Sequence, residues 1–239
     1  MKALGLAWIG VFPVRFDDTV AFLCDVAGLS MFESEPDAAH LVTARGDMVE
    51  VFRPEARYDF ATTGPIPGFL VEDVEVAIDD LRGAAVELLG SGRWRDDAWQ
   101  HFRAPDGFVY EVKSGPYDPS GPGAGLAWAG ARSPHAREMA DFAEHVLGMQ
   151  RTGEEAAMVH LRMPNGDGFE VFLPEDTDHA FMHTGPVVAF GVEDLDAALA
   201  KLDSYRAELF MGGIRTDGTD RWVHFRAPDG CVYELFQRG

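Results

Sequence analysis

Hydrophobic positions in the first part of the chain switch between strand-like and helix-like spacing. The apolar run LAWIGVF is followed by a segment that opens at Asp17 or Asp18 and carries apolar residues from Val20 to Ala27 at helical spacing. Apolar stretches then return at the spacing of short strands around residues 29–34, 39–44 and 47–52. This order predicts one βαβββ unit.

The same order restarts at PGFLVE. A helix capped near Asp73 carries Val74, Ala77, Ile78 and Leu81 on one face. Strands are expected near residues 86–90, 97–103 and 108–113. The second half of the chain repeats the pattern, with helices expected near residues 136–147 and 194–203. The sequence therefore predicts an α+β fold of four βαβββ units.

Two halves of the chain are copies of each other. GLAWIG at residues 5–10 returns as GLAWAG at 125–130, and the stretch FRAPDG also occurs once in each half. Near-constant spacing between such matches over half a chain indicates tandem duplication.

The segment between the copies, SGPYDPSGPGAG, is rich in Gly, Pro and Ser, which is typical of a linker. We therefore expect one domain at residues 1–115, a linker at 116–123 and a second domain at 124–239.

Composition narrows the range of partners. The chain has 40 acidic and 20 basic residues, for a formal net charge of −20. Such a charge repels phosphate backbones and anionic lipid, so we expect no nucleic-acid partner and no membrane partner. No apolar run approaches the length of a membrane span and no signal-peptide pattern opens the chain, so we expect a cytoplasmic protein.

One motif occurs four times: a His followed ten residues later by a Glu, with Gly six residues after the His. The four copies are HLVTARGDMVE at 40–50, HFRAPDGFVYE at 101–111, HLRMPNGDGFE at 160–170 and HFRAPDGCVYE at 224–234. The central residues fit a three-residue hairpin loop that ends in a left-handed Gly. In that register each His lies directly opposite its Glu on one sheet face, with Cβ atoms roughly 4.5–5.5 Å apart.

These residues also carry a family resemblance. A Trp-bearing first strand, a helix that ends in LG and a final APDG-x3-E strand, repeated in βαβββ units, resemble the vicinal oxygen chelate superfamily. That superfamily includes glyoxalase I, extradiol dioxygenases and bleomycin resistance proteins. The resemblance implies two tandem glyoxalase/bleomycin-resistance-like domains, in each of which two units form a curved sheet around a cleft. It also implies either a monomer with a pseudo-dimeric domain pair or a homodimer.

The resemblance supplies a test for a metal, because enzymes of the superfamily hold a divalent ion with side chains from first and fourth strands. The fourth-strand positions are Glu50, Glu111, Glu170 and Glu234, whereas the first-strand positions are Trp8, Ile66, Trp128 and Val187. Indole and aliphatic groups offer no lone pair to a metal. We therefore predict no cofactor and no metal at the superfamily's usual position.

A divalent metal stays open as an alternative, because neutral imidazole and carboxylate are good ligands. The fallback ligands are His40, Glu50, His101, Glu111, His160, Glu170, His224 and Glu234. A simple His–Glu hydrogen bond within each hairpin is the interpretation that we favour, since duplication preserves architecture in every copy.

Two functions follow. The first is a small-molecule-binding protein of the glyoxalase/bleomycin-resistance type, with a partly aromatic, donor-rich ligand in the concave cleft. The alternative is a metal-dependent lyase, isomerase or dioxygenase with a relocated His/Glu site; no catalytic residue is assigned. The expected cleft wall combines Trp8, Glu50, Trp99, His101 and Glu111, or their counterparts Trp128, Glu170, Trp222, His224 and Glu234.

Overall fold

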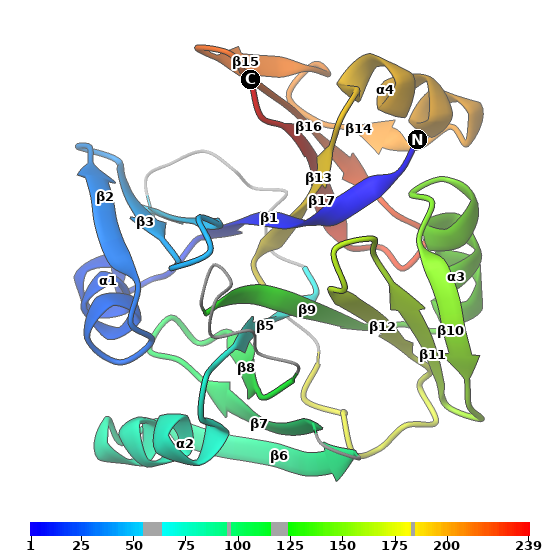
Figure 1. The fold of residues 1–239 in the computed structure, drawn as a ribbon. Coiled ribbons are helices and arrows are strands. Elements are labelled where there is room, and N and C mark those ends of the chain that lie inside the picture. Colours follow the sequence, from blue (N-terminus) through cyan, green and yellow to red (C-terminus); the bar gives the residue numbers. More distant parts are fainter. Residues whose placement is uncertain (55–63, 95–96, 116–123, 183–184) are drawn as a thin grey trace.

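The computed structural model describes residues 1–54, 64–94, 97–115, 124–182 and 185–239. The predicted linker at 116–123 lies outside these residues. The described residues form four helices and two sheets, which confirms the α+β prediction (Figure 1). None of these helices is long and apolar enough to cross a membrane.

Four successive units have the predicted βαβββ order, and the fourth gains one short strand. The first unit comprises β1 (Ala3–Val11), α1 (Phe16–Asp25), β2 (Ser30–Ser34), β3 (Ala38–Val42) and β4 (Met48–Phe52). The second comprises β5 (Ile66–Leu70), α2 (Val74–Gly83), β6 (Glu87–Trp94), β7 (Asp97–Arg103) and β8 (Val109–Lys113). The third comprises β9 (Gly125–Arg132), α3 (Ala136–His145), β10 (Gln150–Glu154), β11 (Met158–Arg162) and β12 (Gly168–Phe172). The fourth comprises β13 (Val187–Val192), α4 (Leu195–Ser204), β14 (Glu208–Leu209), β15 (Arg215–Asp217), β16 (Asp220–Arg226) and β17 (Val232–Gln237).

The units combine into sheets across the two halves of the chain. The first sheet has the order β14-β16-β17-β13-β1-β4-β3-β2, with β15 beside β16, and joins the first unit to the fourth. The second sheet has the order β10-β11-β12-β9-β5-β8-β7-β6 and joins the third unit to the second. In Figure 1 the blue β1 accordingly runs beside the gold β13, and the green β9 beside β5.

This pairing corrects the expectation that both units of one half share a curved sheet. Within each sheet the two units are joined through their first strands: β1 pairs antiparallel with β13, and β5 pairs antiparallel with β9. The backbone hydrogen bonds of a strand edge are the same whichever copy supplies the partner. The repeat therefore identifies the copies but does not identify which of them pair.

Each sheet has one face covered by helices and one that we call its helix-free face. Helix α1 contacts β4, α2 contacts β7 and β8, α3 contacts β10, β11 and β12, and α4 contacts β17. The main core lies between helices and strands and contains buried residues of all four helices. Two smaller apolar clusters hold no helix residue and mark the helix-free faces. One cluster centres on Trp8 in the first sheet, the other on Trp128 in the second.

Helix starts match the sequence in part. Asp73 caps α2 as predicted, since its carboxylate accepts hydrogen bonds from the backbone N–H groups of Glu75 and Val76. The first helix, in contrast, begins at Phe16 after Arg15, with no side-chain cap. The predicted opening residues Asp17 and Asp18 lie in its first turn, where carboxylates favour the positive end of the helix dipole.

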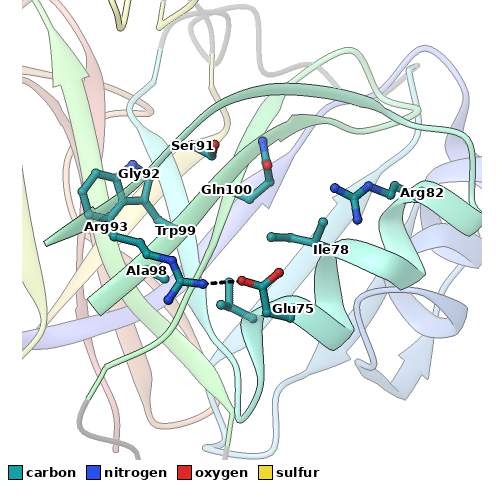
Figure 2. A pocket seen from close by; sticks show the side chains of 10 residues that line it. Glu75, Ile78, Arg82, Ser91, Gly92, Arg93, Ala98, Trp99 and Gln100 are labelled. Carbon is teal, nitrogen blue, oxygen red and sulfur yellow. Dashed lines mark hydrogen bonds and ion pairs between the residues drawn. The ribbon is translucent and has the colours of Figure 1, made fainter. Parts of the chain in front are cut away.

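A pocket of about 290 Å³ lies between α2 and strands β6 and β7 (Figure 2). An ion pair between Arg93 and Glu75 lies at its edge. The Gln100 side-chain amide donates to the carbonyls of Leu89 and Gly90 at 3.1 and 3.2 Å, where β6 shifts register against β7. The amide thus satisfies carbonyls that the ladder leaves unpaired.

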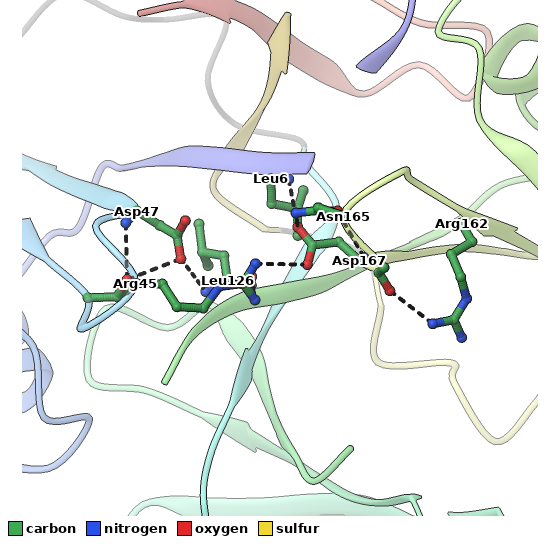
Figure 3. A network of polar contacts seen from close by, with 9 residues as sticks. Leu6, Arg45, Asp47, Leu126, Arg162, Asn165 and Asp167 are labelled. Atoms are coloured by element: carbon green, nitrogen blue, oxygen red, sulfur yellow. Dashed lines mark hydrogen bonds and ion pairs between the residues drawn. The ribbon is translucent and has the colours of Figure 1, made fainter. Parts of the chain in front are cut away.

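A reciprocal set of hydrogen bonds joins the two sheets (Figure 3). The Leu126 N–H, in β9, donates to Asp47 Oδ2 at 2.8 Å, and the Leu6 N–H, in β1, donates to Asp167 Oδ2 at 2.9 Å. Arg45 bridges the two sides, donating to the Leu126 carbonyl at 3.0 Å and to Asp167 Oδ1 at 3.3 Å. The hairpin loop of the first unit thus binds the first strand of the third unit, and the hairpin loop of the third unit binds the first strand of the first. This fixes the two Trp-bearing strands relative to each other.

Candidate functional site

The four His–Glu hairpins have the predicted register. His40 pairs with Glu50, His101 with Glu111, His160 with Glu170 and His224 with Glu234. The loop glycines Gly46, Gly107, Gly166 and Gly230 have φ values of 89°, 88°, 97° and 86°. The left-handed Gly that the loop type requires is therefore present in every hairpin.

Two of the four pairs are half-buried and two are buried. His40 Nδ1 lies 3.0 Å from Glu50 Oε1, and in both side chains about a fifth of the surface is exposed, at 19% and 20%. The pair of His160 and Glu170 is similar, with 2.8 Å between Nδ1 and Oε1. A second form of the pair, in which Nε2 faces the carboxylate, is buried: the distance is 3.1 Å for His101 and Glu111 and 3.0 Å for His224 and Glu234.

Each sheet carries one half-buried and one buried pair, because each combines two units. Glu50 and Glu234 belong to the first sheet, Glu111 and Glu170 to the second. The expected wall that joined Trp8 and Glu50 to Glu111 is therefore wrong. The structure brings together Trp8, Glu50, Trp222, His224 and Glu234 on the first sheet, and Trp128, Glu170, His101 and Glu111 on the second.

Trp99 stands apart from the others on its sheet. Trp222 packs against the cluster around Trp8, whereas Trp99 lines the pocket beside α2. Its ring lies over Gly92 on the paired strand, where a Cβ would come within 2.4 Å of it. Trp99 is thus the one predicted wall residue that the structure associates with the pocket of Figure 2.

Each central Trp lies flat along its own strand over a glycine. A Cβ at Gly10 would lie 2.1 Å from Trp8 Cη2, and one at Gly130 would lie 2.2 Å from Trp128 Cη2. The indoles are almost fully buried, at 6% and 3% exposure. The signal was present in the sequence as Trp-x-Gly in AWIG and AWAG. It shows that the indole fills the centre of each helix-free face.

The residues do not fit the divalent ion of the superfamily. Trp8 with Val187, and Trp128 with Ile66, stand at the first-strand positions and offer no lone pair. Among the described ranges, no group of three or more His, Cys, Asp or Glu residues is placed to hold one metal ion. The eight fallback ligands thus form pairs and not a coordination sphere. Whether the purified protein carries a metal stays a prediction.

The helix-free face of the first sheet carries two carboxylates, Glu50 and Glu234, that are close enough to interact. Burial raises the pKa of Glu234, the hydrogen bond from His224 lowers it, and the charge of Glu50 raises it again, for a net rise. The hydrogen bond to Glu50 raises the pKa of His40 against the effect of burial, and the charges of Glu35 and Glu33 raise it further. Two carboxylates of this face therefore repel each other, and a cation between them would be stabilised.

The corresponding face of the second sheet is partly neutralised. Burial raises the pKa of Glu170, but the hydrogen bond and charge of His160 outweigh it. The Lys113 ammonium and a hydrogen bond with Trp128 lower the pKa further, so the net shift is downward. The sequence did not predict the effect of Lys113 on this face, because nothing in the His–Glu pattern marks its position.

A segment that the sequence did not indicate covers the second face. His179, Phe181 and Met182 come from the loop after β12 and contact residues of this face. Met182 is buried among Trp128, Phe172 and their neighbours. The predicted wall of the second sheet is thus occupied by the chain itself.

Residues 125–235 match the family model described as Glyoxalase/Bleomycin resistance protein/Dioxygenase superfamily. The match covers just under half of the chain, and over these residues the sequence is similar to that superfamily. No curated protein matches the sequence significantly.

Solved structures extend the likeness, in fold, to nearly the whole chain. A putative dioxygenase from Bacillus subtilis subsp. subtilis str. 168 is 16% identical with a TM-score of 0.77, over 99% of this chain and 86% of that chain. Glyoxalase I from Zea mays is 15% identical with a TM-score of 0.70, over 98% of this chain and 92% of that chain. At these identities the likeness establishes the two-sheet fold and no particular activity.

Proposed function

We propose that the helix-free face of the first sheet binds a small organic molecule that combines an aromatic or apolar part with hydrogen-bond donors, preferably carried on a cationic group. The observation that carries the proposal is the placement of Glu50 and Glu234. Both carboxylates lie on this face, close enough that the charge of Glu50 raises the pKa of Glu234. A donor-bearing cation relieves that repulsion, whereas an anion increases it.

The surroundings of the two carboxylates are aromatic. Trp8, Phe12, Phe52, Trp222 and Phe236 belong to the apolar cluster of this face. The rings of Phe12 and Phe52 stack at 4.7 Å with 7° between their planes. Aromatic faces attract cations as well as flat apolar groups, so the same surface suits both parts of the proposed ligand.

The second sheet supports this role less well. Lys113 lowers the pKa of Glu170, and residues of the chain cover Trp128. The residues Trp99, His101, Glu111, Trp128 and Glu170 therefore remain candidates for ligand contact only where the covering segment is displaced. A metal-dependent lyase, isomerase or dioxygenase has no supporting ligand group among the described residues. The domain limits at 115 and 124 and a cytoplasmic location also remain predictions.

Three probes of equal length test the proposal: 4-phenylbutylamine, 4-phenylbutanol and 4-phenylbutyrate. Each is titrated into the protein at pH 7 and followed by NMR. We expect the amine to bind best and the carboxylate worst. Trp8→Ala should weaken binding of the amine by about 1–3 kcal/mol, because it removes the buried indole against which the aromatic side chains of this face pack. Glu50→Gln should reduce the preference for the amine over the alcohol.

Trp128→Ala is the matched control, since it removes the equivalent indole from the covered sheet. It should leave the affinity for the amine unchanged. Equal affinity for all three probes, or equal losses in Trp8→Ala and Trp128→Ala with both variants folded by circular dichroism, would refute the proposal.

A further inference from the structure

The segment 174–182 takes part in the packing of the second sheet rather than lying loosely above it. Met182 is 4% exposed and belongs to the buried cluster of Trp128 and Phe172. Phe181 packs against the same cluster. A Cβ at Gly90 of β6 would come within 3.2 Å of the Phe181 ring, so the strand beneath is shaped to admit it. The segment thus fits a surface that the strands provide.

Two flat rings of the segment occupy the region next to His101. The His179 ring lies 4.3 Å from that of Phe172, tilted by 34°, and 5.6 Å from that of His101 in an edge-on arrangement. Phe181 lies 5.0 Å from the His101 ring, and Trp128 approaches the same ring at 5.9 Å. These are the separations at which aromatic pairs attract each other. The face therefore receives rings by stacking and edge contacts.

The His179 ring is oriented by a hydrogen bond. Its Nδ1 lies 3.0 Å from both carboxylate oxygens of Asp176, and its backbone N–H donates to the same carboxylate at 3.0 Å. A half-buried nitrogen heterocycle needs a hydrogen-bond acceptor for its ring N–H. Here the heterocycle is the imidazole of His179 and the acceptor is the carboxylate of Asp176.

An arginine of the sheet holds the beginning of the segment. Arg132, at the end of β9, donates from Nη2 to the Pro174 carbonyl at 2.6 Å and from Nε to the Asp176 carbonyl at 3.1 Å. Phe12 stands at the equivalent position of the first sheet. The anchor is thus specific to the sheet that carries the segment.

We propose that residues 174–182 are a built-in occupant of the second sheet, and that the face beneath Phe181 and His179 is a second binding site, for a flat aromatic ring. His179 and Phe181 supply that chemistry within the chain. An external ring must compete with a tethered one, whose effective concentration is high. The site is therefore closed in the resting protein and opens when the segment is displaced. It shares no residue with the proposed site of the first sheet.

The ring site is tested with 4-methylimidazole, which has the ring of His179, and with propionamide as a non-aromatic control of similar size. Binding is followed through the indole N–H signal of Trp128, identified by its loss in Trp128→Phe. We expect His179→Ala to bind 4-methylimidazole at least about tenfold more tightly than the unaltered protein. Propionamide should not distinguish the two proteins. Equal binding of 4-methylimidazole to both proteins would overturn the proposal.

The anchor is tested separately by hydrogen exchange, so that the proposal can still fail if His179→Ala does not fold. Arg132→Ala is compared with Arg162→Ala, which also loses an arginine bond to a backbone carbonyl, at Gly166, but not one that touches the segment. We expect the Met182 N–H, which donates to the His179 carbonyl, to exchange about tenfold faster in Arg132→Ala alone. Strands β9 and β12 should keep their protection. Unchanged exchange of the Met182 N–H, or faster exchange throughout both strands, would show that the segment does not open as a unit.

Discussion

The helix-free faces of the two sheets have equivalent residues at their centres and different residues around them. Both contain a Trp lying over a Gly and two opposed His–Glu pairs. Phe12 and Phe236 flank these residues in the first sheet, whereas Arg132 and Lys113 stand at the same positions of the repeat in the second. Arg132 holds the covering segment and Lys113 lowers the pKa of Glu170.

The features that the two faces share are structural. The His–Glu pairs occur in all four hairpins, on the face with two interacting carboxylates and on the partly neutralised face, so they stabilise the hairpin and do not determine the charge of the face. The residues that change between the copies determine charge and access. In a duplicated protein, the residues that differ between equivalent positions are therefore a better guide to ligand chemistry than the residues that the copies share.

The largest expected effect concerns the buried pairs, which should behave alike in both sheets. Replacing His101 or His224 by Ala leaves Glu111 or Glu234 buried without its imidazole. Breaking a buried pair on one side costs about 3–5 kcal/mol. Chemical denaturation at pH 7 should show this loss for both variants.

The half-buried pairs are the matched controls. His40→Ala and His160→Ala should each reduce the free energy of unfolding by less than about 1 kcal/mol, because solvent reaches their carboxylates. Similar losses in all four variants would contradict the division into buried and half-buried pairs.

The glycines beneath the indoles should show the next largest effect. Gly10→Ala and Gly130→Ala place a methyl group where Trp8 and Trp128 lie, at 2.1 and 2.2 Å. Overpacking of this kind costs about 1–3 kcal/mol. The loss should be greater for Gly130→Ala, because Gly68 and Gly168 also lie close to Trp128 and leave its ring less room to move. Thermal unfolding of both variants checks the order, and Gly83→Ala, where a Cβ meets nothing within 4 Å, serves as the control.

A pH effect should be common to both sheets, because it comes from their shared hairpin loops. Burial raises the pKa of Asp106 to about 6. The folded protein then keeps this proton to a higher pH than the unfolded chain does. The stability contributed by the protonated group is present below about pH 4 and decreases as the pH rises to about 6.

Asp106→Asn should therefore lessen the decrease in stability between pH 4 and pH 6, by no more than about 2 kcal/mol. Its counterpart Asp229→Asn should act in the same direction, since burial also raises the pKa of Asp229. Both carboxylates accept a tyrosine hydroxyl at 2.7 Å, from Tyr110 and Tyr233. Urea titrations at several pH values measure the effect. Opposite signs in the two variants would show that the hairpin loops are not equivalent.

The smallest expected effect comes from exchanging the flanking residues. Phe236→Lys places an ammonium group on the face of Glu50 and Glu234 and should weaken binding of 4-phenylbutylamine by less than about 1 kcal/mol. Lys113→Phe should raise the pKa of Glu170, because it removes a charge that stabilises the carboxylate. Neither exchange should alter the fold by circular dichroism. An increase in amine affinity in Phe236→Lys would contradict the electrostatic account.

The sequence predicted local structure well because local rules determine it. Loop length and the position of the glycine are enough to place His40 opposite Glu50, and the same holds in the other three hairpins. The helix cap at Asp73 follows from residue type and spacing. The α+β class follows from the alternation of strand-like and helix-like spacing of the apolar residues.

The sequence could not predict contacts that depend on tertiary pairing. Either half could have joined its own two units, so Glu50 was expected beside Glu111 and lies instead with Glu234. His179 reaches His101 from a loop with no periodic pattern, and a lone histidine there carries no signal. The bridge from Arg45 to Asp167 likewise joins residues whose proximity only the sheet arrangement creates.

A single pH titration of the side-chain carboxyl carbons of Glu234 and Glu170, followed by NMR in the same sample, tests the difference between the two faces most directly. We predict that Glu234 titrates above the ordinary pKa of a glutamate and Glu170 below it. Lowering the pH from neutrality should therefore protonate Glu234 first. If the two carboxyls titrate together, or in the reverse order, their surroundings do not differ as described and the proposed preference for a cation loses its basis.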